Sequence, residues 1–175
     1  MGAYVAMLRG VNVGGKNKIK MPDLQALFVA LGHQDVVTYI QSGNVVFKGP
    51  AAQASAIEKR IKRDLGLDIA VVLRTKAELA KVIAANPFVR AGADLAKLHV
   101  TFLAEKADAD LVYRLERHCS PTEEFDVRGR EVYLHCPDGL GRTKLTNAFQ
   151  VRRPEITATT RNWNTVNKLL ELADR

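Results

Sequence analysis

A glycine-rich segment near the N-terminus, GVNVGGK at residues 10–16, has the residue types that bind phosphate groups. Its glycine-to-lysine spacing matches the phosphate-binding loop of nucleotide hydrolases, except that Asn17 stands where that loop has Ser or Thr. The missing hydroxyl would hold magnesium, and in such loops a helix begins at the lysine so that its N-terminus faces the phosphates. Here the first helix signal is Pro22. The sequence therefore argues against ATP or GTP hydrolysis by this mechanism.

The same loop has the residues for a simpler anion site. Gly14 and Gly15 can adopt positive φ angles and bring backbone N–H groups close to a ligand. Arg9, Asn12 and Lys16 add side chains that donate hydrogen bonds. We therefore predict that these five residues contact an anionic ligand.

The Ser42-Gly43-Asn44 turn is expected at the same end of the sheet as this loop, because the strands that precede the loop and the turn run in the same direction. Ser42 and Asn44 are therefore predicted to complete the site. A flexible basic loop beside an ordinary hairpin is an equally open interpretation.

A second candidate group lies in the C-terminal third of the chain, in GLGRTKLTN at 139–147 and TTRNWN at 159–164. Each stretch places basic residues at an expected helix start, and Thr143 is expected to cap a helix over 143–151. Because a strand expected near 156–160 ends where that helix begins, the two stretches are predicted neighbours. Cations at helix N-termini oppose the helix dipole, which favours a bound anion over simple capping. The predicted ligand-binding residues are Arg142, Thr143, Lys144, Arg161 and Asn162.

The elements that must position these loops follow from apolar spacing and turn residues. Strands are expected at 3–9, 35–41, 44–48 and 69–73, with helices at 22–31, 53–65 and 75–85, the last opened by a capping box from Thr75 to Glu78. The order then repeats, with strands at 97–103, 123–128, 130–135 and 156–160 and helices at 108–118, 143–151 and 163–173. This pattern predicts an α+β fold of two ferredoxin-like (βαββαβ) plaits in tandem, over residues 1–88 and 94–175, each with an antiparallel sheet and an added helix.

The charge of the chain is positive and concentrated. The net charge is +7, and residues 9–20 hold four basic residues and no acid. Residues 139–163 hold five basic residues, Arg152 and Arg153 among them, against one acid. Such concentration predicts an anionic partner. No apolar run is long enough for a membrane span, no export signal is present, and the two cysteines are expected to be thiols, so we expect a cytoplasmic protein that does not bind membranes.

Metal and catalytic motifs are weak. His118-Cys119 and His135-Cys136 carry ligands that zinc prefers, but adjacent residues in a strand point to opposite faces, so we expect no metal and no cofactor. The G-x-S-x-G motif of a nucleophile elbow does not occur. Whether the protein is an enzyme stays open at this point.

Four longer motifs together resemble a known family. RGVNVGGKNKIKM, TYIQSGNVVF, GRTKLTNAF and ATTRNWNTVNKLLELA are similar to the motifs of the mostly bacterial family called domain of unknown function 1697. The resemblance implies the two-plait fold and supplies no activity. A Ser-Lys-Leu-Thr-Asn pattern common in that family stands here as Thr143 to Asn147, which keeps the hydroxyl. The family motifs fall on the loops selected above from their chemistry.

These observations favour binding of a small phosphorylated or nucleotide-like anion by the basic loops. The alternative is weak, non-specific and salt-sensitive nucleic-acid binding. RNA-recognition plaits stack bases on strand aromatics, and residues 44–48 lack that signature in a chain that is only 6% aromatic. The oligomeric state stays open.

Overall fold

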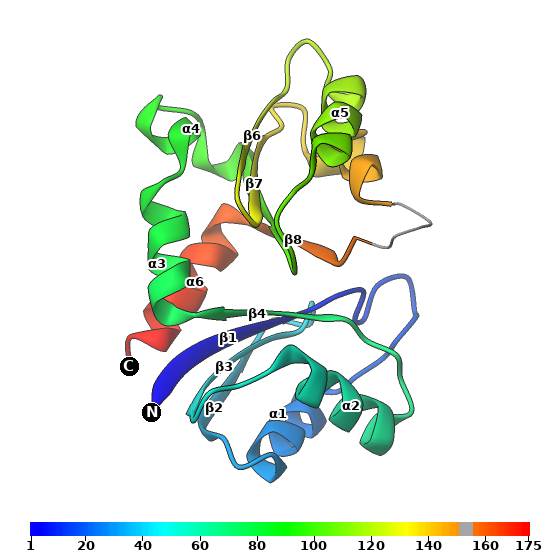
Figure 1. The fold of residues 1–175 in the computed structure, drawn as a ribbon, viewed down its shortest axis with the longest axis vertical. Helices are drawn as coiled ribbons and strands as arrows, with labels where there is room; N and C mark the ends of the chain where they lie inside the picture. Colours follow the sequence, from blue (N-terminus) through cyan, green and yellow to red (C-terminus); the bar gives the residue numbers. More distant parts are fainter. Residues whose placement is uncertain (151–155) are drawn as a thin grey trace. The chain divides into compact units, whose positions relative to one another are not determined.

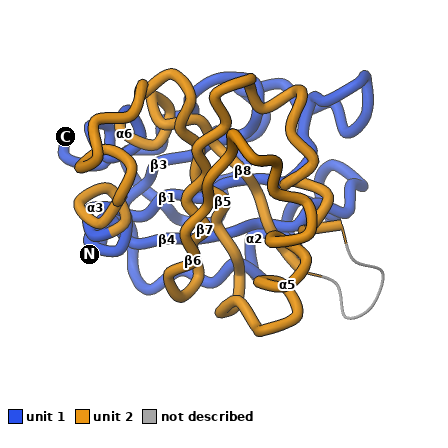
Figure 2. The backbone as a smooth tube through the Cα atoms, turned by 90° about the horizontal axis from the view of Figure 1, so that it is seen from above, with its two compact units in different colours: residues 1–81, 168–175 blue, residues 82–167 orange. Residues whose placement is uncertain are grey.

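The computed structural model describes residues 1–150 and 156–175 of the 175-residue chain. The chain forms two compact units, coloured separately in Figure 2. The first comprises residues 1–81 and 168–175, and the second comprises residues 82–167. In the tandem division expected from the sequence, residues 168–175 belong to the second half.

The first unit contains a four-stranded antiparallel sheet with strand order β2-β3-β1-β4. Its central strand β1 pairs with β3 from Gly2 opposite Gly49 to Met7 opposite Asn44. Helices α1 and α2 lie on the same face of the sheet (Figure 1). The elements are β1 (Gly2–Leu8), α1 (Met21–Ala30), β2 (Gln34–Tyr39), β3 (Asn44–Gly49), α2 (Ala54–Leu65), β4 (Val71–Thr75) and α3 (Lys76–Ala84), which continues into the second unit.

Local signals account for these helices. Pro22 lies in the first turn of α1, where its missing N–H costs no hydrogen bond. Helix α2 ends at Leu65 and is capped by Gly66, whose φ of 70° is the left-handed conformation of a helix C-cap. The capping box of α3 is confirmed, because Glu78 N–H donates to Thr75 Oγ1 at 3.1 Å and Thr75 N–H donates to Glu78 Oε2 at 2.8 Å.

The core of the first unit packs the apolar stripes of α1 and α2 against one face of the sheet. Leu24, Leu27 and Phe28 come from α1, as the periodicity predicts, and meet Phe47 of β3. The rings of Phe28 and Phe47 are tilted by 55° with centroids 5.1 Å apart, a favourable aromatic geometry. The packing of this core holds in position the end of the sheet from which the glycine-rich loop projects.

The second unit repeats the arrangement, with a four-stranded antiparallel sheet of order β6-β7-β5-β8. Helix α5 packs on one face with the Leu145–Phe149 segment (Figure 1). Asp108 caps α5 as predicted, because its carboxylate accepts from Leu111 N–H at 2.8 Å. The elements are α4 (Pro87–Arg90), β5 (Leu98–Leu103), α5 (Ala109–His118), β6 (Glu124–Arg128), β7 (Glu131–His135), β8 (Ala158–Asn162) and α6 (Trp163–Ala173), which ends in the first unit.

One predicted element is wrong in this unit, and one is shifted by two residues. The α-helix expected over 143–151 is replaced by two short 3₁₀ segments, Leu140–Arg142 and Leu145–Phe149; residue 151, Arg152 and Arg153 lie outside the described residues. Thr143 Oγ1 accepts from Leu145 N–H at 3.0 Å, so the side chain competes with helical bonding. The last strand is shifted from 156–160 to Ala158–Asn162.

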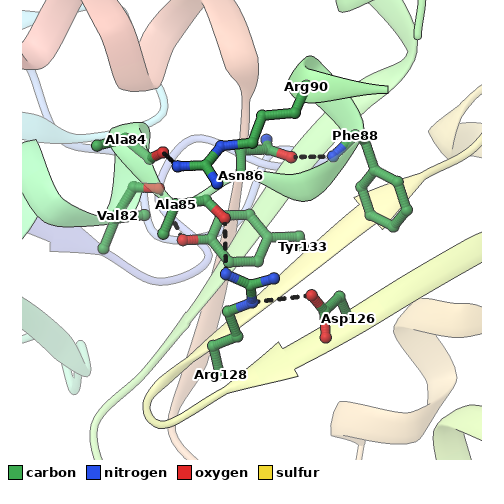
Figure 3. A network of polar contacts seen from close by, with 9 residues as sticks. All are labelled: Val82, Ala84, Ala85, Asn86, Phe88, Arg90, Asp126, Arg128 and Tyr133. Carbon is green, nitrogen blue, oxygen red and sulfur yellow. Dashed lines mark hydrogen bonds and ion pairs between the residues drawn. The ribbon is translucent and has the colours of Figure 1, made fainter. Parts of the chain in front are cut away.

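Carbonyl groups at the end of α3 and just after it accept hydrogen bonds from side chains elsewhere in the second unit (Figure 3). The Tyr133 hydroxyl, from β7, donates to Val82 O at 2.7 Å. Arg128 Nη1 donates to Ala85 O at 3.1 Å, and its Nε contacts Asp126 Oδ2 at 2.9 Å. Helix C-termini leave such carbonyls without intrahelical partners, so these contacts attach the end of α3 to the β6–β7 hairpin.

In the described part of the chain, no helix has the length and apolar character needed to cross a membrane.

Candidate functional site

The glycine-rich loop of the first unit is a small hairpin rather than a phosphate-binding loop. Lys16 N–H donates to Val13 O at 3.0 Å, and Asn12 N–H donates to Asn17 O at 3.2 Å. The two residues at the tip, Gly14 and Gly15, have φ angles of 58° and 75°. Positive φ at both central residues is typical of a type I′ turn, which explains the glycine pair without any ligand.

Asn12 attaches this hairpin to the rest of the unit. Its Nδ2 donates to Ile19 O at 3.0 Å and to Gln41 O at 2.8 Å, while its Oδ1 accepts from Ile19 N–H at 2.9 Å. The amide thus uses both of its N–H donors within the protein. Asn12 positions the loop in this structure, and direct contact with a ligand stays a prediction.

The turn before β3 lies at the same end of the sheet as the loop, as predicted. Leu8 N–H donates to Gly43 O at 2.9 Å, which joins the end of β1 to the turn. Asn44 is fully buried, and its Nδ2 donates to Tyr39 O at 3.0 Å and to Ser42 Oγ at 3.1 Å. These two predicted ligand contacts, Ser42 and Asn44, are hydrogen-bonded to each other within the turn.

Ile40 in the same turn has an uncommon backbone conformation. Its φ is +52°, which is a genuine outlier for a β-branched residue, and 46% of its surface is exposed. The two residues beside it are held by asparagines, because Tyr39 O accepts from Asn44 and Gln41 O accepts from Asn12. Strain that the surrounding structure holds in place clusters at functional sites, so the turn supports a site here.

A hollow of about 790 Å³ lies where the hairpin, the turn and the start of α1 meet. Two of the predicted residues, Asn12 and Gly15, line it, whereas Arg9 and Lys16 are exposed on the same loop outside the lining. Gly14, Ser42 and Asn44 also lie outside the lining. The lining consists of Asn12, Gly15, Lys18, Ile19, Lys20, Met21, Pro22, Asp23, Gln41 and Leu65.

Two lysines that line this hollow, Lys18 and Lys20, are not among the residues predicted from the sequence. Lys18 and Lys20 are exposed on either side of the buried Ile19, an alternation that indicates an extended segment with both lysines on one side. That signal was available in the sequence. Leu65 comes from the end of α2 and carries no local signal, because only tertiary packing brings it to the loop.

The Asn12 hydrogen bonds predict a stability effect. We expect Asn12→Gly to lower the free energy of unfolding by about 1–3 kcal/mol, because three hydrogen bonds are lost while the positive φ stays allowed. Urea denaturation measures the change. Val13→Ala, at an exposed position of the same hairpin, is the control and should change stability by less than about 0.5 kcal/mol. Equal effects of the two substitutions would contradict the positioning role.

In the second unit, the predicted residues Arg161 and Asn162 have structural partners. Arg161 lies within β8 and is 8% exposed, and its Nη1 donates to Thr159 Oγ1 at 2.6 Å and Thr160 O at 3.1 Å. Burial lowers the pKa of Arg161 to about 10, so the side chain is still charged at neutral pH. Asn162 caps α6 by accepting from Thr165 N–H at 2.8 Å. Whether either residue also binds a ligand stays a prediction.

The structure places Arg142 and Lys144 in a second hollow, of about 750 Å³. Thr143 lies between them in sequence but outside the lining, as do Arg161 and Asn162. The described residues that line this hollow are Arg117, His118, Cys119, Ser120, Glu123, Asp138, Arg142, Lys144 and Asn147.

Comparison with known proteins identifies the family. The family described as "Protein of unknown function (DUF1697)" matches residues 1–133. The chain belongs to this family. The matched residues of this DUF1697 member include the hairpin and the Ile40 turn, whereas GLGRTKLTN and TTRNWN lie beyond them.

A solved structure shares the fold of this DUF1697 member over almost its whole length. It is that of the conserved bacterial protein SP0830 from Streptococcus pneumoniae, with a TM-score of 0.75 and 22% sequence identity over 98% of each chain. At this identity the likeness concerns the fold alone. No protein with curated annotation matches the sequence.

The cysteines lie in environments that keep their thiols protonated. Burial and the nearby Glu123 and Glu124 raise the pKa of Cys119, and burial raises the pKa of Cys136 to about 11. Neither thiol is therefore activated as a nucleophile at neutral pH. Within residues 1–150 and 156–175, no group of three or more His, Cys, Asp or Glu side chains could hold a metal ion.

Proposed function

We propose that this DUF1697 protein binds a small anionic ligand, phosphorylated and nucleotide-like, in the hollow of its first unit. The observation that carries the proposal is the combination of Lys18 and Lys20 with the apolar side chains of Met21, Pro22 and Leu65 in one hollow. The charged groups suit the phosphate of a nucleotide, and the apolar groups beside them suit its base. The volume of about 790 Å³ is in the range of small-molecule sites.

The lysines supply the phosphate part of the proposed site. Lys20 is the N-cap residue of α1 and Lys18 lies two residues before it, near the positive end of the helix dipole, so a bound anion would relieve repulsion there. Asp23 and Leu24 N–H groups donate to Lys20 O at 3.0 and 3.1 Å. Because these backbone donors are already used, the phosphate would lie against the lysine side chains.

The apolar residues supply a surface for a flat ring. Met21 and Leu65 are half-buried and Pro22 is exposed, and they come from the start of α1 and the end of α2. Such side chains gain stability when a ring covers them, at roughly 25 cal/mol per Å² of apolar surface. A bare phosphate would leave this surface exposed, so a ligand with a base or ring is favoured.

The finer fold assignment belongs to the same proposal. We infer that each sheet with its helical layer is a ferredoxin-like plait, and the repeated strand orders β2-β3-β1-β4 and β6-β7-β5-β8 support this. That fold hosts many unrelated functions, so the proposed function depends on the site and not on the fold.

The location and source of the protein are also inferred. The two free cysteines support a reducing location, the cytoplasm, and the bacterial SP0830 supports a bacterial source.

The test is a thermal-shift screen followed by calorimetric titration. The probes are inorganic phosphate, nucleoside monophosphates, glucose 6-phosphate and a short single-stranded RNA, each at low and high salt. We expect a nucleoside monophosphate to stabilise the protein at both salt concentrations. The double variant Lys18→Ala/Lys20→Ala should weaken that binding at least about tenfold, because charge-assisted hydrogen bonds contribute roughly 1.5–3 kcal/mol each.

The control variant is Lys59→Ala, an exposed lysine on α2 outside the lining of the hollow. It should bind the probe as the unmodified protein does. Stabilisation only by the RNA, and only at low salt, would replace the proposal with non-specific nucleic-acid binding. No stabilisation by any probe, or equal weakening by the control variant, would contradict it.

A further inference from the structure

The hollow in the second unit has a lining of a different kind. Its nine described lining residues are charged or polar, apart from the thiol of Cys119. We propose that it is a separate binding site for a small hydroxyl-bearing phosphate ester of the sugar-phosphate or polyol-phosphate class. No large aliphatic side chain comparable with Met21, Pro22 and Leu65 of the first hollow lines it, so this ligand class differs from the one proposed for the first unit.

Chain segments of the second unit alone build the hollow. The end of α5 and the turn that follows it supply residues 117–123, and the segment after β7 supplies residues 138–147. The second segment is held by the packing of Leu145, Ala148 and Phe149 in the core against α5. Because Leu145 is buried, its neighbour Lys144 is left exposed in the lining.

The carboxylates in the hollow already have hydrogen-bond partners. Glu123 is 9% exposed, and its Oε1 accepts from Ser120 N–H at 3.1 Å. Asp138 Oδ2 accepts from the Thr122 hydroxyl at 3.1 Å. These bonds hold the turn together. Glu123 is buried and is also hydrogen-bonded to the Cys136 thiol, whereas Asp138 keeps its second carboxylate oxygen for a ligand hydroxyl.

The cations, in contrast, are not neutralised. Arg142 and Lys144 are exposed and form no ion pair with another residue in the part of the chain that the structure describes. Arg117 uses one N–H in a bond to the Tyr113 hydroxyl at 3.2 Å. Three cations with further N–H donors favour a phosphate group, and the Asp138 carboxylate favours a hydroxyl group on the same molecule.

Cys119 provides a reporter within the site. It lines the hollow and is half-buried, and its Sγ donates to Glu123 O at 3.3 Å, whereas Cys136 is fully buried. A bound ligand would cover this thiol. The rate at which an uncharged reagent labels Cys119 therefore measures occupancy of the hollow without any assumption about catalysis.

The experiment follows labelling of Cys119 by N-ethylmaleimide with mass spectrometry. The probe is glycerol 3-phosphate. The controls are glycerol, which lacks the phosphate, and sodium chloride at the same ionic strength as the probe. We expect glycerol 3-phosphate to slow labelling several-fold in a saturable manner, and the two controls to leave the rate unchanged. Arg142→Ala/Lys144→Ala should raise the concentration needed for protection at least about tenfold. Lys106→Ala, an exposed lysine of the same unit, should not.

The failure of this proposal can be told apart from failure of the first. Lys18→Ala/Lys20→Ala should leave protection of Cys119 unchanged, because those lysines line the other hollow. Loss of protection in that variant would overturn the assignment of a separate site. Absence of protection by glycerol 3-phosphate in the unmodified protein would overturn the site itself, whatever the nucleotide titrations show.

Discussion

Gly43→Ala, which adds a single methyl group, should lower the free energy of unfolding by about 2–4 kcal/mol. This is the largest effect that we predict for a substitution at the loop end of the first sheet. Gly43 has a φ of +86°, where an L side chain is strained. A Cβ at this position would lie 3.1 Å from Leu8 Cβ and 3.4 Å from Val11 Cβ. Both neighbours are buried, so neither can move away cheaply.

The matched control for this substitution is Gly14→Ala at the tip of the hairpin. Gly14 has a similarly positive φ of 58°, but a Cβ there would meet no atom within 4 Å. It should therefore cost only the backbone strain, about 1–2 kcal/mol. Urea denaturation of both variants separates the two contributions. If Gly43→Ala cost no more than Gly14→Ala, close packing of the turn on β1 would not limit this site.

The consequence for ligand binding follows from the same geometry. The Gly43 carbonyl accepts from Leu8 N–H, and the adjacent Asn44 holds the Tyr39 end of the strained Ile40 turn. A shift of Gly43 would therefore move Gln41 at the edge of the hollow. We expect Gly43→Ala to weaken nucleotide binding as well as stability, whereas Gly14→Ala should affect binding less because a Cβ at Gly14 meets no atom within 4 Å and so displaces no neighbour.

Removal of the Tyr133 hydroxyl is the second large effect. Tyr133→Phe should destabilise the protein by about 1–3 kcal/mol, because the buried Val82 carbonyl would lose its donor at 2.7 Å. Tyr113→Phe is the control, since Tyr113 is 55% exposed and water can replace its hydrogen bond to Arg117. We expect the control to change stability by less than about 0.5 kcal/mol. Equal effects would contradict a role for Tyr133 in holding the end of α3.

The same hydroxyl predicts a loss of stability at alkaline pH. Burial, with Glu131 as a second cause, raises the pKa of Tyr133 from 10.0 to about 12. Folding therefore favours the neutral hydroxyl, and this contribution is fully present below pH 10.0 and decreases as the pH rises to about 12. A shift of this size corresponds to roughly 3 kcal/mol.

Denaturation curves of the unmodified protein and Tyr133→Phe, recorded from neutral pH to about pH 12, test this contribution. The unmodified protein should lose more stability over the alkaline range than the variant does. Below pH 10.0 the difference between the two proteins should be constant. Parallel curves throughout would show that Tyr133 does not become harder to ionise on folding.

The elements that form through local interactions could be predicted from the sequence. The Thr75–Glu78 capping box, the Asp108 cap, the apolar stripe of α1 and the strand pairs joined by short turns depend on residues a few positions apart. The loop and the Ser42–Asn44 turn were placed at one end of the sheet by topology alone, and the Leu8–Gly43 hydrogen bond confirms this. The alternation of Lys18 and Lys20 about Ile19 belongs to the same local class, although it was not recognised.

Tertiary structure alone decided which of these residues are free to bind a ligand. Asn12, Ser42 and Asn44 have the types expected of a site, yet their hydrogen bonds hold the loop and the turn. Arg161 is buried within a strand, and the segment after Thr143 follows a 3₁₀ path that the helix signals did not indicate. Leu65 and Arg117 reach the hollows from helices that are distant in sequence from the basic loops. A side chain's type determines which bonds it can form, but its partners are fixed by packing between residues far apart in the chain, and no local pattern in the sequence records that packing.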